Sequence, residues 1–454
     1  MSLLRVLSNG DKNRQLMALA IPMILSNITI PLLGLVDTAV IGHLGEAYYL
    51  GGVALGSTII TLIVWLLGFL RMSTTGLVAQ AYGAQDNHTQ QQLLVQGIGL
   101  ALLLAIGALA LQQPILSLAL NLTEASAQVQ HYCRQYVEIR IWSLPFALTN
   151  LVLLGWLLGR QQPKAAMWQL IIANIANIVL DVIFVIGFQW DVQGAALASV
   201  IADICAFTVA AVMVTRQLKQ QQNHFAWSQL RQHLKFTGLS RLLTLNRDIF
   251  IRSLCLQAAF SFMAFYGAGL GDTTLAANAV LLNLLMLISY ALDGIAYYAE
   301  AEVGRAVGQR NPTLLFESVS LAFAWSAIIA LIFSGGFWLF GNHIIHLLTN
   351  IPSVQQTANT YLFWLIAMPI LAFGCYLFDG VYIGAAQGQV MRNSMILATF
   401  GVYFPLWWSM QSFENHALWG ALCAFMLFRS LSLGWHYQYR LKKHVSKTFK
   451  IQST

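Results

Sequence analysis

The chain has 454 residues, of which 58% are hydrophobic and only 9% are charged. Soluble domains normally carry about 25% charged residues, so this composition excludes a soluble protein and indicates a polytopic membrane protein. The net charge of +7 could indicate a nucleic-acid partner, but the basic residues lie in short segments between apolar runs, where they act as topology signals. We therefore expect the lipid bilayer, and no nucleic acid, as a partner.

Apolar runs long enough to cross about 30 Å of hydrocarbon recur along the whole chain. The first is too long for the core of a signal peptide, so we expect it to remain as a membrane anchor. The fold class predicted is an all-α polytopic membrane protein with twelve transmembrane helices. In chain order the predicted spans cover residues 17–42, 50–72, 93–118, 130–158, 165–188, 194–215, 242–268, 275–303, 314–340, 358–386, 394–412 and 418–439.

The loops between these spans are unequal in charge. Loops on one side contain nearly all the basic residues, among them Arg71, Arg160, Arg216, Arg305 and Arg392. The opposite loops contain no Lys or Arg and several acids. By the positive-inside rule, both termini are predicted to be cytoplasmic, in a bacterial inner (plasma) membrane.

The second half of the chain repeats the first with a shift of about 225 residues. Gly155 and Gly159 of the segment GWLLG match Gly380 and Gly384 of GVYIG. Each half holds six predicted spans, so both enter the membrane in the same direction and are related by a pseudo-twofold axis along the membrane normal. This symmetry favours an alternating-access transporter, and a duplicated scaffold or channel is the alternative. The predicted domains are an N-terminal lobe at 1–215, a cytoplasmic linker at 216–241, a C-terminal lobe at 242–440 and a basic cytoplasmic tail at 441–454.

Asp37 is the only formal charge in the apolar stretch from Ile21 to Ile41. An ionised carboxylate inside a bilayer costs a few kcal/mol, so chains keep one there chiefly to move ions or to bind a ligand. Asp181 lies at a similar depth in the fifth predicted span, and neither acid has a counterpart in the second half. Two ionised carboxylates at one site repel each other, so one is expected to hold a proton, or a cation is expected to bridge them.

Further polar residues of the first half fall at this depth, about 8 to 11 Å below the outer surface at 1.5 Å per residue. Spacings of three and four residues place polar side chains on one face of the fifth helix and one face of the sixth. They are predicted to surround one polar site, with an interhelical hydrogen-bond network as the alternative. The residues concerned are Tyr136, Asn174, Asn177, Ser199 and Asp203.

Three stretches of the chain resemble a known family. They are LGLVDTAVIGHLG at 33–45, MSTTGLVAQAYGAQD at 72–86 and NIANIVLDVIFVIG at 174–187. They look like segments of the multidrug and toxic compound extrusion (MATE) transporters, and the residues of the first two stretches are similar to the DinF-like branch. The resemblance covers essentially the whole chain and implies a two-lobed secondary transporter that expels amphiphilic or cationic small molecules in exchange for protons or sodium ions. It implies no cofactor or metal besides the coupling ion, and we expect a monomer.

The resemblance also implies roles for individual residues. The coupling site for a cation or proton falls on Asp37, Asp181, Asn177 and Ser199. Tyr136 and Asn150 match neighbouring polar positions of the family. Spacing on the helix faces, rather than the resemblance, adds Asn174 and Asp203 as supporting polar or cavity positions.

Three more residues are candidates for lesser roles. Pro22 matches a proline at which the first helix is proposed to bend on protonation, and proline does weaken a helix by removing a hydrogen bond. The alternative is a proline tolerated in the first turns of the span. Asp293 and Asp379 are weaker candidates in the C-terminal lobe, because another branch of the family uses acids of that lobe for sodium.

Other functional classes fit the sequence less well. We find none of the motifs HExxH, GxSxG or GxxxxGK, so an enzyme is not expected. A flippase for lipids or lipid-linked precursors is the closer alternative, because related exporters share the two-lobe design. Such flippases usually have basic residues inside the cavity. Here the predicted spans contain only Arg134, Arg140, Arg252 and Arg429, which favours neutral or cationic cargo.

Overall fold

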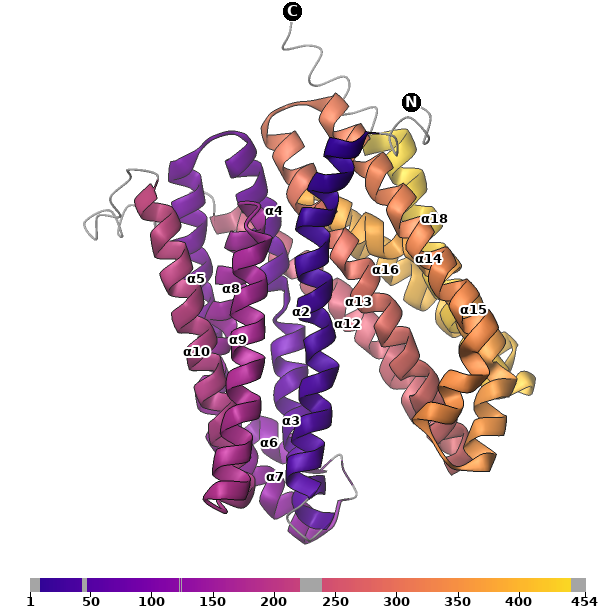
Figure 1. Cartoon of the computed structure of the whole chain (residues 1–454). Helices are drawn as coiled ribbons and strands as arrows, with labels where there is room; N and C mark the ends of the chain where they lie inside the picture. The colour runs from indigo at the N-terminus through magenta and orange to yellow at the C-terminus, as the bar shows by residue number, and fades with distance from the viewer. Residues whose placement is uncertain (1–8, 43–46, 122, 124, 221–238, 442–454) are drawn as a thin grey trace, which may run out of the picture. The chain divides into compact units, whose positions relative to one another are not determined.

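The computed structural model describes residues 9–42, 47–121, 123, 125–220 and 239–441, and every regular element in these ranges is a helix. The prediction of an all-α fold is confirmed. Figure 1 shows the helices in chain order.

The described residues of the first half form nine α-helices, some of which pair end to end to make one span. A 3₁₀ turn, Ile141–Ser143, joins α7 to α8, and a π-helical segment, Val182–Gly187, continues α9. The helices are α2 (Gly10–Gly42), α3 (Ala47–Leu66), α4 (Phe69–Gly83), α5 (Asn87–Ala110), α6 (Gln112–Asn121), α7 (Ala127–Arg140), α8 (Leu144–Gly159), α9 (Pro163–Asp181) and α10 (Asp191–Gln220).

In the second half, the described residues 239–441 form four long helices, then a span made of two short ones, then a final helix. A π-helical segment, Leu397–Tyr403, connects the short helices α16 and α17. The helices are α12 (Leu239–Gly269), α13 (Asp272–Gly308), α14 (Pro312–Leu348), α15 (Pro352–Gly384), α16 (Gly388–Ile396), α17 (Phe404–Ser409) and α18 (Asn415–His436).

Ten helical segments of the described residues are long and apolar enough to cross a membrane. Helix α2 and the run from α16 to α17 correspond to the remaining two of the twelve predicted spans. Several helices are longer than predicted: α2 begins at Gly10 rather than 17, and α14 reaches Leu348 rather than 340. These turns extend beyond the hydrocarbon, where a helix no longer needs apolar residues, so hydropathy underestimates them. Residues 221–238 of the predicted linker lie outside the described residues.

Contacts divide the chain into two compact units. We call them the N-terminal unit (Leu25–Val78 and Asp86–Leu242) and the C-terminal unit (Met1–Ile24, Ala79–Gln85 and Leu243–Thr454). The start of α2 and the end of α4 thus group with the C-terminal unit. The lobe boundaries given above remain a prediction.

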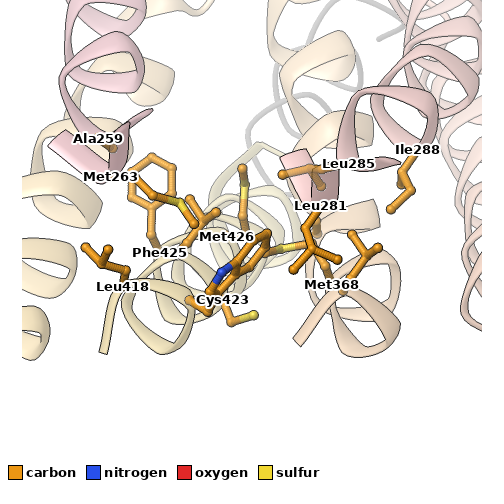
Figure 2. Close-up of a cluster of buried hydrophobic side chains, with 14 of the residues drawn as sticks. Ala259, Met263, Leu281, Leu285, Ile288, Met368, Leu418, Cys423, Phe425 and Met426 are labelled. Atoms are coloured by element: carbon orange, nitrogen blue, oxygen red, sulfur yellow. The ribbon is translucent and has the colours of Figure 1, made fainter. Parts of the chain in front are cut away.

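An apolar core holds the C-terminal unit together. Figure 2 shows side chains from α12, α13, α15 and α18 pointing toward one another. Met263, Leu285, Met368 and Phe425 are fully buried in this cluster. Methionine side chains adapt to irregular gaps between helices, which suits a core built where four helices meet.

Backbone geometry repeats with the same 225-residue shift as the sequence. Left-handed backbone conformations at Gln85 and Gln161 recur at Arg310 and Ala386. The side chain of Asp86 caps α5, and the side chain of Asn311, 225 positions later, caps α14 in the same way. The duplication therefore preserves turns and caps even where the residue types differ.

Two glycines of the repeat allow the end of α4 and the end of α13 to touch backbone to backbone within the C-terminal unit. A Cβ atom added to Gly83 would clash with the carbonyl oxygen of Arg305, and one added to Gly308 would clash with the carbonyl oxygen of Gln80. Both the glycines and their contact residues are 225 positions apart. Small residues permit such close helix approach in membranes. We call this contact the α4–α13 crossing.

We expect Gly308→Leu to lower the Tm of the purified protein in detergent, because overpacking typically costs about 1–3 kcal/mol. Gly335→Leu on α14 is the matched control, since nothing lies within 4 Å of a Cβ added there. Thermal unfolding followed by size-exclusion chromatography measures both variants. Equal Tm values for the two would show that the crossing is not tightly packed.

Candidate functional site

A cavity of about 180 Å³ lies inside the N-terminal unit, between α2, α3, α7, α9 and α10. Ser57 and Thr61 of α3 add hydroxyl groups to its wall, and Leu33 of α2 adds an apolar side chain. Five of the residues predicted from depth and spacing line it together, namely Tyr136, Asn174, Asn177, Ser199 and Asp203. The structure thus brings these side chains to one place, while their roles remain a prediction.

Hydrogen bonds tie the helices around the cavity to one another. Asn177 Nδ2 donates to Ser199 Oγ at 3.2 Å and so connects α9 to α10. Asn174 Nδ2 donates to Thr29 Oγ1 and connects α9 to α2. Such interhelical bonds between polar side chains stabilise membrane bundles by about 0.6 kcal/mol each. Asn174 and Asn177 can make both contacts because their spacing of three puts them on one helix face.

An ion pair also borders the cavity. Arg140 Nη1 of α7 lies 2.6 Å from Asp203 Oδ2 of α10, and Arg140 donates to Ser143 as well. Asn150 Nδ2 donates to the backbone carbonyl of Asp203 at 3.1 Å and holds this part of α10 in place. The sequence places Arg140 inside a predicted span without indicating its partner. The available signal was that an arginine inside a membrane needs a carboxylate partner.

The two predicted coupling acids lie one helical turn beyond cavity-lining residues. Asp181 is the last residue of α9, is 3% exposed, and follows Asn177 by four positions. Asp37 lies on α2, four positions after Leu33; its side chain is outside the described residues. Leu33 and Asn177 both line the cavity.

The register of α2 against α9 places these two acids at a similar height. The two helices run in the same direction and are joined by the Thr29–Asn174 hydrogen bond. Asp37 lies eight residues beyond Thr29, and Asp181 lies seven beyond Asn174. At 1.5 Å per residue these offsets are about 12 Å and about 10.5 Å. The two residues therefore lie at similar heights along α2 and α9, and their role in one site remains a prediction.

Pro22 lies well inside a continuous helix. Helix α2 starts at Gly10 and continues through Pro22 to Gly42, and Pro22 is buried. Polar residues extend α2 toward its N-terminus beyond the apolar run, so Pro22 lies in the helix interior while it still lies near the start of the predicted span at 17–42. Whether α2 bends there stays a prediction.

The C-terminal candidates have different surroundings. Asp379 on α15 is held between Arg252 of α12 and Arg429 of α18, the latter at 2.7 Å. A sodium ion at this carboxylate would meet two guanidinium groups, which argues against Asp379 as a cation site. Asp293 lies half-buried on α13. Near the end of that helix, Glu302 pairs with Arg305 at 2.6 Å. Among the described residues, no group of three His, Cys, Asp or Glu side chains could hold a metal ion.

Comparisons with known proteins identify relatives along the whole chain. The MatE family matches residues 22–183 and 249–408, which are corresponding parts of the two halves of the repeat. The chain is 47% identical over 436 residues to "DNA damage-inducible protein F" of Escherichia coli strain K12, covering 94% of this chain and 92% of that protein. It is 26% identical over 420 residues to a "Probable multidrug resistance protein NorM" of Synechocystis, covering 86% of this chain and 85% of that protein.

Solved structures share the fold. A MATE protein in a bent conformation superposes with a TM-score of 0.85 at 19% identity, covering 99% of both chains. The Vibrio cholerae MATE transporter VcmN, in a variant form, superposes with a TM-score of 0.83 at 20% identity, covering 95% of this chain and 97% of that one. Both the family match and the close relative lead to one conclusion: the chain belongs to the MatE family, whose members are secondary transporters rather than enzymes and have twelve transmembrane helices in two lobes.

Proposed function

We propose that this chain exports toxic or drug-like small molecules, amphiphilic or cationic, in exchange for cations that enter the cell. Asp37 and Asp181, with Asn177 and Ser199, form the coupling site, and the protein works by alternating access. The observation that carries this proposal is the shared height of Asp37 and Asp181, one turn beyond the polar cavity of the N-terminal unit. Relatives named for multidrug resistance support the same cargo class.

Exchange follows from competition at the acids. While the carboxylates are ionised, a cationic or polar cargo gains favourable interactions in the cavity. An ion that neutralises Asp37 or Asp181 removes that attraction and releases the cargo. Two carboxylates in one low-dielectric site titrate as a coupled pair, so a single proton or sodium ion changes the charge of the whole site. A charge that crosses 100 mV supplies about 2.3 kcal/mol, roughly a fortyfold concentration ratio of cargo.

The proton is the coupling ion we favour, with sodium as the alternative. The two arginines around Asp379 argue against a second sodium site on that carboxylate. Coupling then depends on the acid pair of the N-terminal unit alone, and binding and release of one proton is sufficient to change the charge of that pair. The repeat supports a coupling site in one half only, since the positions that match Asp37 and Asp181 in the second half are not acids.

A lipid or lipid-linked precursor flippase remains the second candidate from the sequence. Basic residues inside the cavity would favour it, and Arg140 does line the cavity. Its guanidinium is neutralised by Asp203, however, so the described lining offers no excess positive charge to a phosphate headgroup. Efflux of neutral or cationic molecules therefore suits the cavity better.

The charge bias of the loops supports the orientation with both termini in the cytoplasm of a bacterial cell.

Replacing either acid with its amide tests the coupling site. We expect Asp37→Asn to reduce ion-driven efflux of a fluorescent cation to background, and Asp181→Asn to reduce it at least about tenfold, because neither amide can exchange a proton. Both proteins should still elute as folded monodisperse species. Asp272→Asn is the matched control, since Asp272 is exposed at the start of α13. Full efflux by Asp37→Asn would contradict the proposal.

Imposing one gradient at a time identifies the coupling ion. In reconstituted vesicles, a pH gradient without sodium is expected to drive efflux of the cation, and a sodium gradient at constant pH is expected to drive less. Fluorescence of the trapped dye reports the rate. Efflux driven by the sodium gradient but not by the pH gradient would identify sodium, rather than the proton, as the coupling ion. No response to either gradient would refute ion-coupled antiport.

A further inference from the structure

Among the described residues that line the cavity, only Arg140 and Asp203 carry formal charges. Their charges cancel, so this lining is neutral toward a cargo molecule. Both side chains are partly accessible, with 15% of Arg140 and 22% of Asp203 exposed. They can therefore interact with what enters the cavity, unlike an ion pair that is sealed inside a protein core.

Each partner also keeps unused hydrogen-bonding groups. The pair uses Arg140 Nη1 and Asp203 Oδ2. Within the described part of the chain, no hydrogen bond is assigned to Asp203 Oδ1 or to Arg140 Nε and Nη2. A guanidinium has five N–H donors and a carboxylate about four lone-pair sites, so both retain capacity for a ligand.

The internal repeat shows what distinguishes this pair. Gly194 of α10 aligns with Gly420 of α18, a shift of 226 residues, so Asp203 corresponds to Arg429, while Arg140 corresponds to the apolar Leu365. Arg429 pairs with Asp379 of α15, and both of these side chains are at most 10% exposed. The second half therefore joins the matching helices by an ion pair that is sealed in the core, whereas the Arg140–Asp203 pair borders a cavity and stays partly accessible.

We infer that the Arg140–Asp203 pair is a charge filter, in which Arg140 cancels Asp203 and so sets the net charge of the cargo that the cavity accepts. This inference rests on the proposed function and adds the determinant of cargo selectivity. With Arg140 in place, the carboxylate of Asp203 does not attract cations on its own account. The attraction for a cationic cargo is then left to the coupling acids, whose charge changes during the cycle.

Two substitutions with opposite signs test the filter. Arg140→Gln leaves Asp203 uncompensated, and Asp203→Asn leaves Arg140 uncompensated. An added unit charge about 10 Å away at an effective dielectric constant near 20 changes affinity by about tenfold. The probes are three fluorescent amphiphiles with the same aromatic body and a cationic, a neutral or an anionic headgroup. Their Kd values are measured with purified protein in detergent, without any gradient.

The filter predicts changes of opposite direction. Arg140→Gln should bind the cation about tenfold tighter and the anion about tenfold weaker, Asp203→Asn should do the reverse, and the neutral probe should change little. The double variant should return to the selectivity of the unmodified protein. Arg134→Gln is the matched control, because Arg134 lies on the same helix and bonds to Gln113 instead. It should leave all three Kd values unchanged.

A purely structural pair gives a different result. In that case both single variants weaken all three probes alike, and the double variant restores nothing; either finding overturns the filter. If Arg140→Gln does not fold, Asp203→Asn alone decides, since it preserves the shape of the side chain. Because the binding assay uses no gradient, its result is independent of ion coupling. If the variants shift charge selectivity as predicted but the unmodified protein shows no ion-driven efflux, the coupling proposal alone is refuted. If the unmodified protein shows ion-driven efflux but the variants leave charge selectivity unchanged, the filter alone is refuted.

Discussion

A charge placed among transmembrane helices needs an opposite charge close by, because little water is present to solvate it. This constraint explains much of the polar architecture. In the N-terminal unit, Arg140 pairs with Asp203 across α7 and α10. In the C-terminal unit, Asp379 lies between two arginines and joins three helices. Each pairing fixes which helix faces meet, and the polar cavity lies beside the first of them.

The scaffold is duplicated, but its chemistry is not. Turn geometry, helix caps and the glycines of the α4–α13 crossing recur with a shift of 225 residues. The charged residues do not recur in kind: Arg140 matches the apolar Leu365, and Asp203, aligned through Gly194 and Gly420, matches the oppositely charged Arg429. Backbone features are thus kept in both halves, because both must form the same bundle. The ionisable residues are free to differ, and the coupling chemistry is concentrated in one half.

Much of this arrangement could be predicted from the sequence. Composition and hydropathy identify the membrane class and the spans, and spacings of three and four residues group Asn174 with Asn177 and Ser199 with Asp203. The ion pairs could not be predicted in the same way. Arg140 and Asp203 are 63 positions apart, and depth counting gives the height of a residue but not the direction in which its helix face points. The ends of α2 and α14 were also missed, because helices continue beyond the apolar region.

The central claim is that an entering cation and the cargo compete for the acid pair of Asp37 and Asp181. Cargo affinity measured at equilibrium, without a gradient, tests it most directly. The Kd of a fluorescent cation is determined in detergent while pH is lowered at constant sodium, and then while sodium is raised at constant pH. The account predicts that binding weakens as the coupling ion accumulates, and that Asp37→Asn and Asp181→Asn reduce this dependence. A Kd that is independent of both ions in the unmodified protein would contradict it.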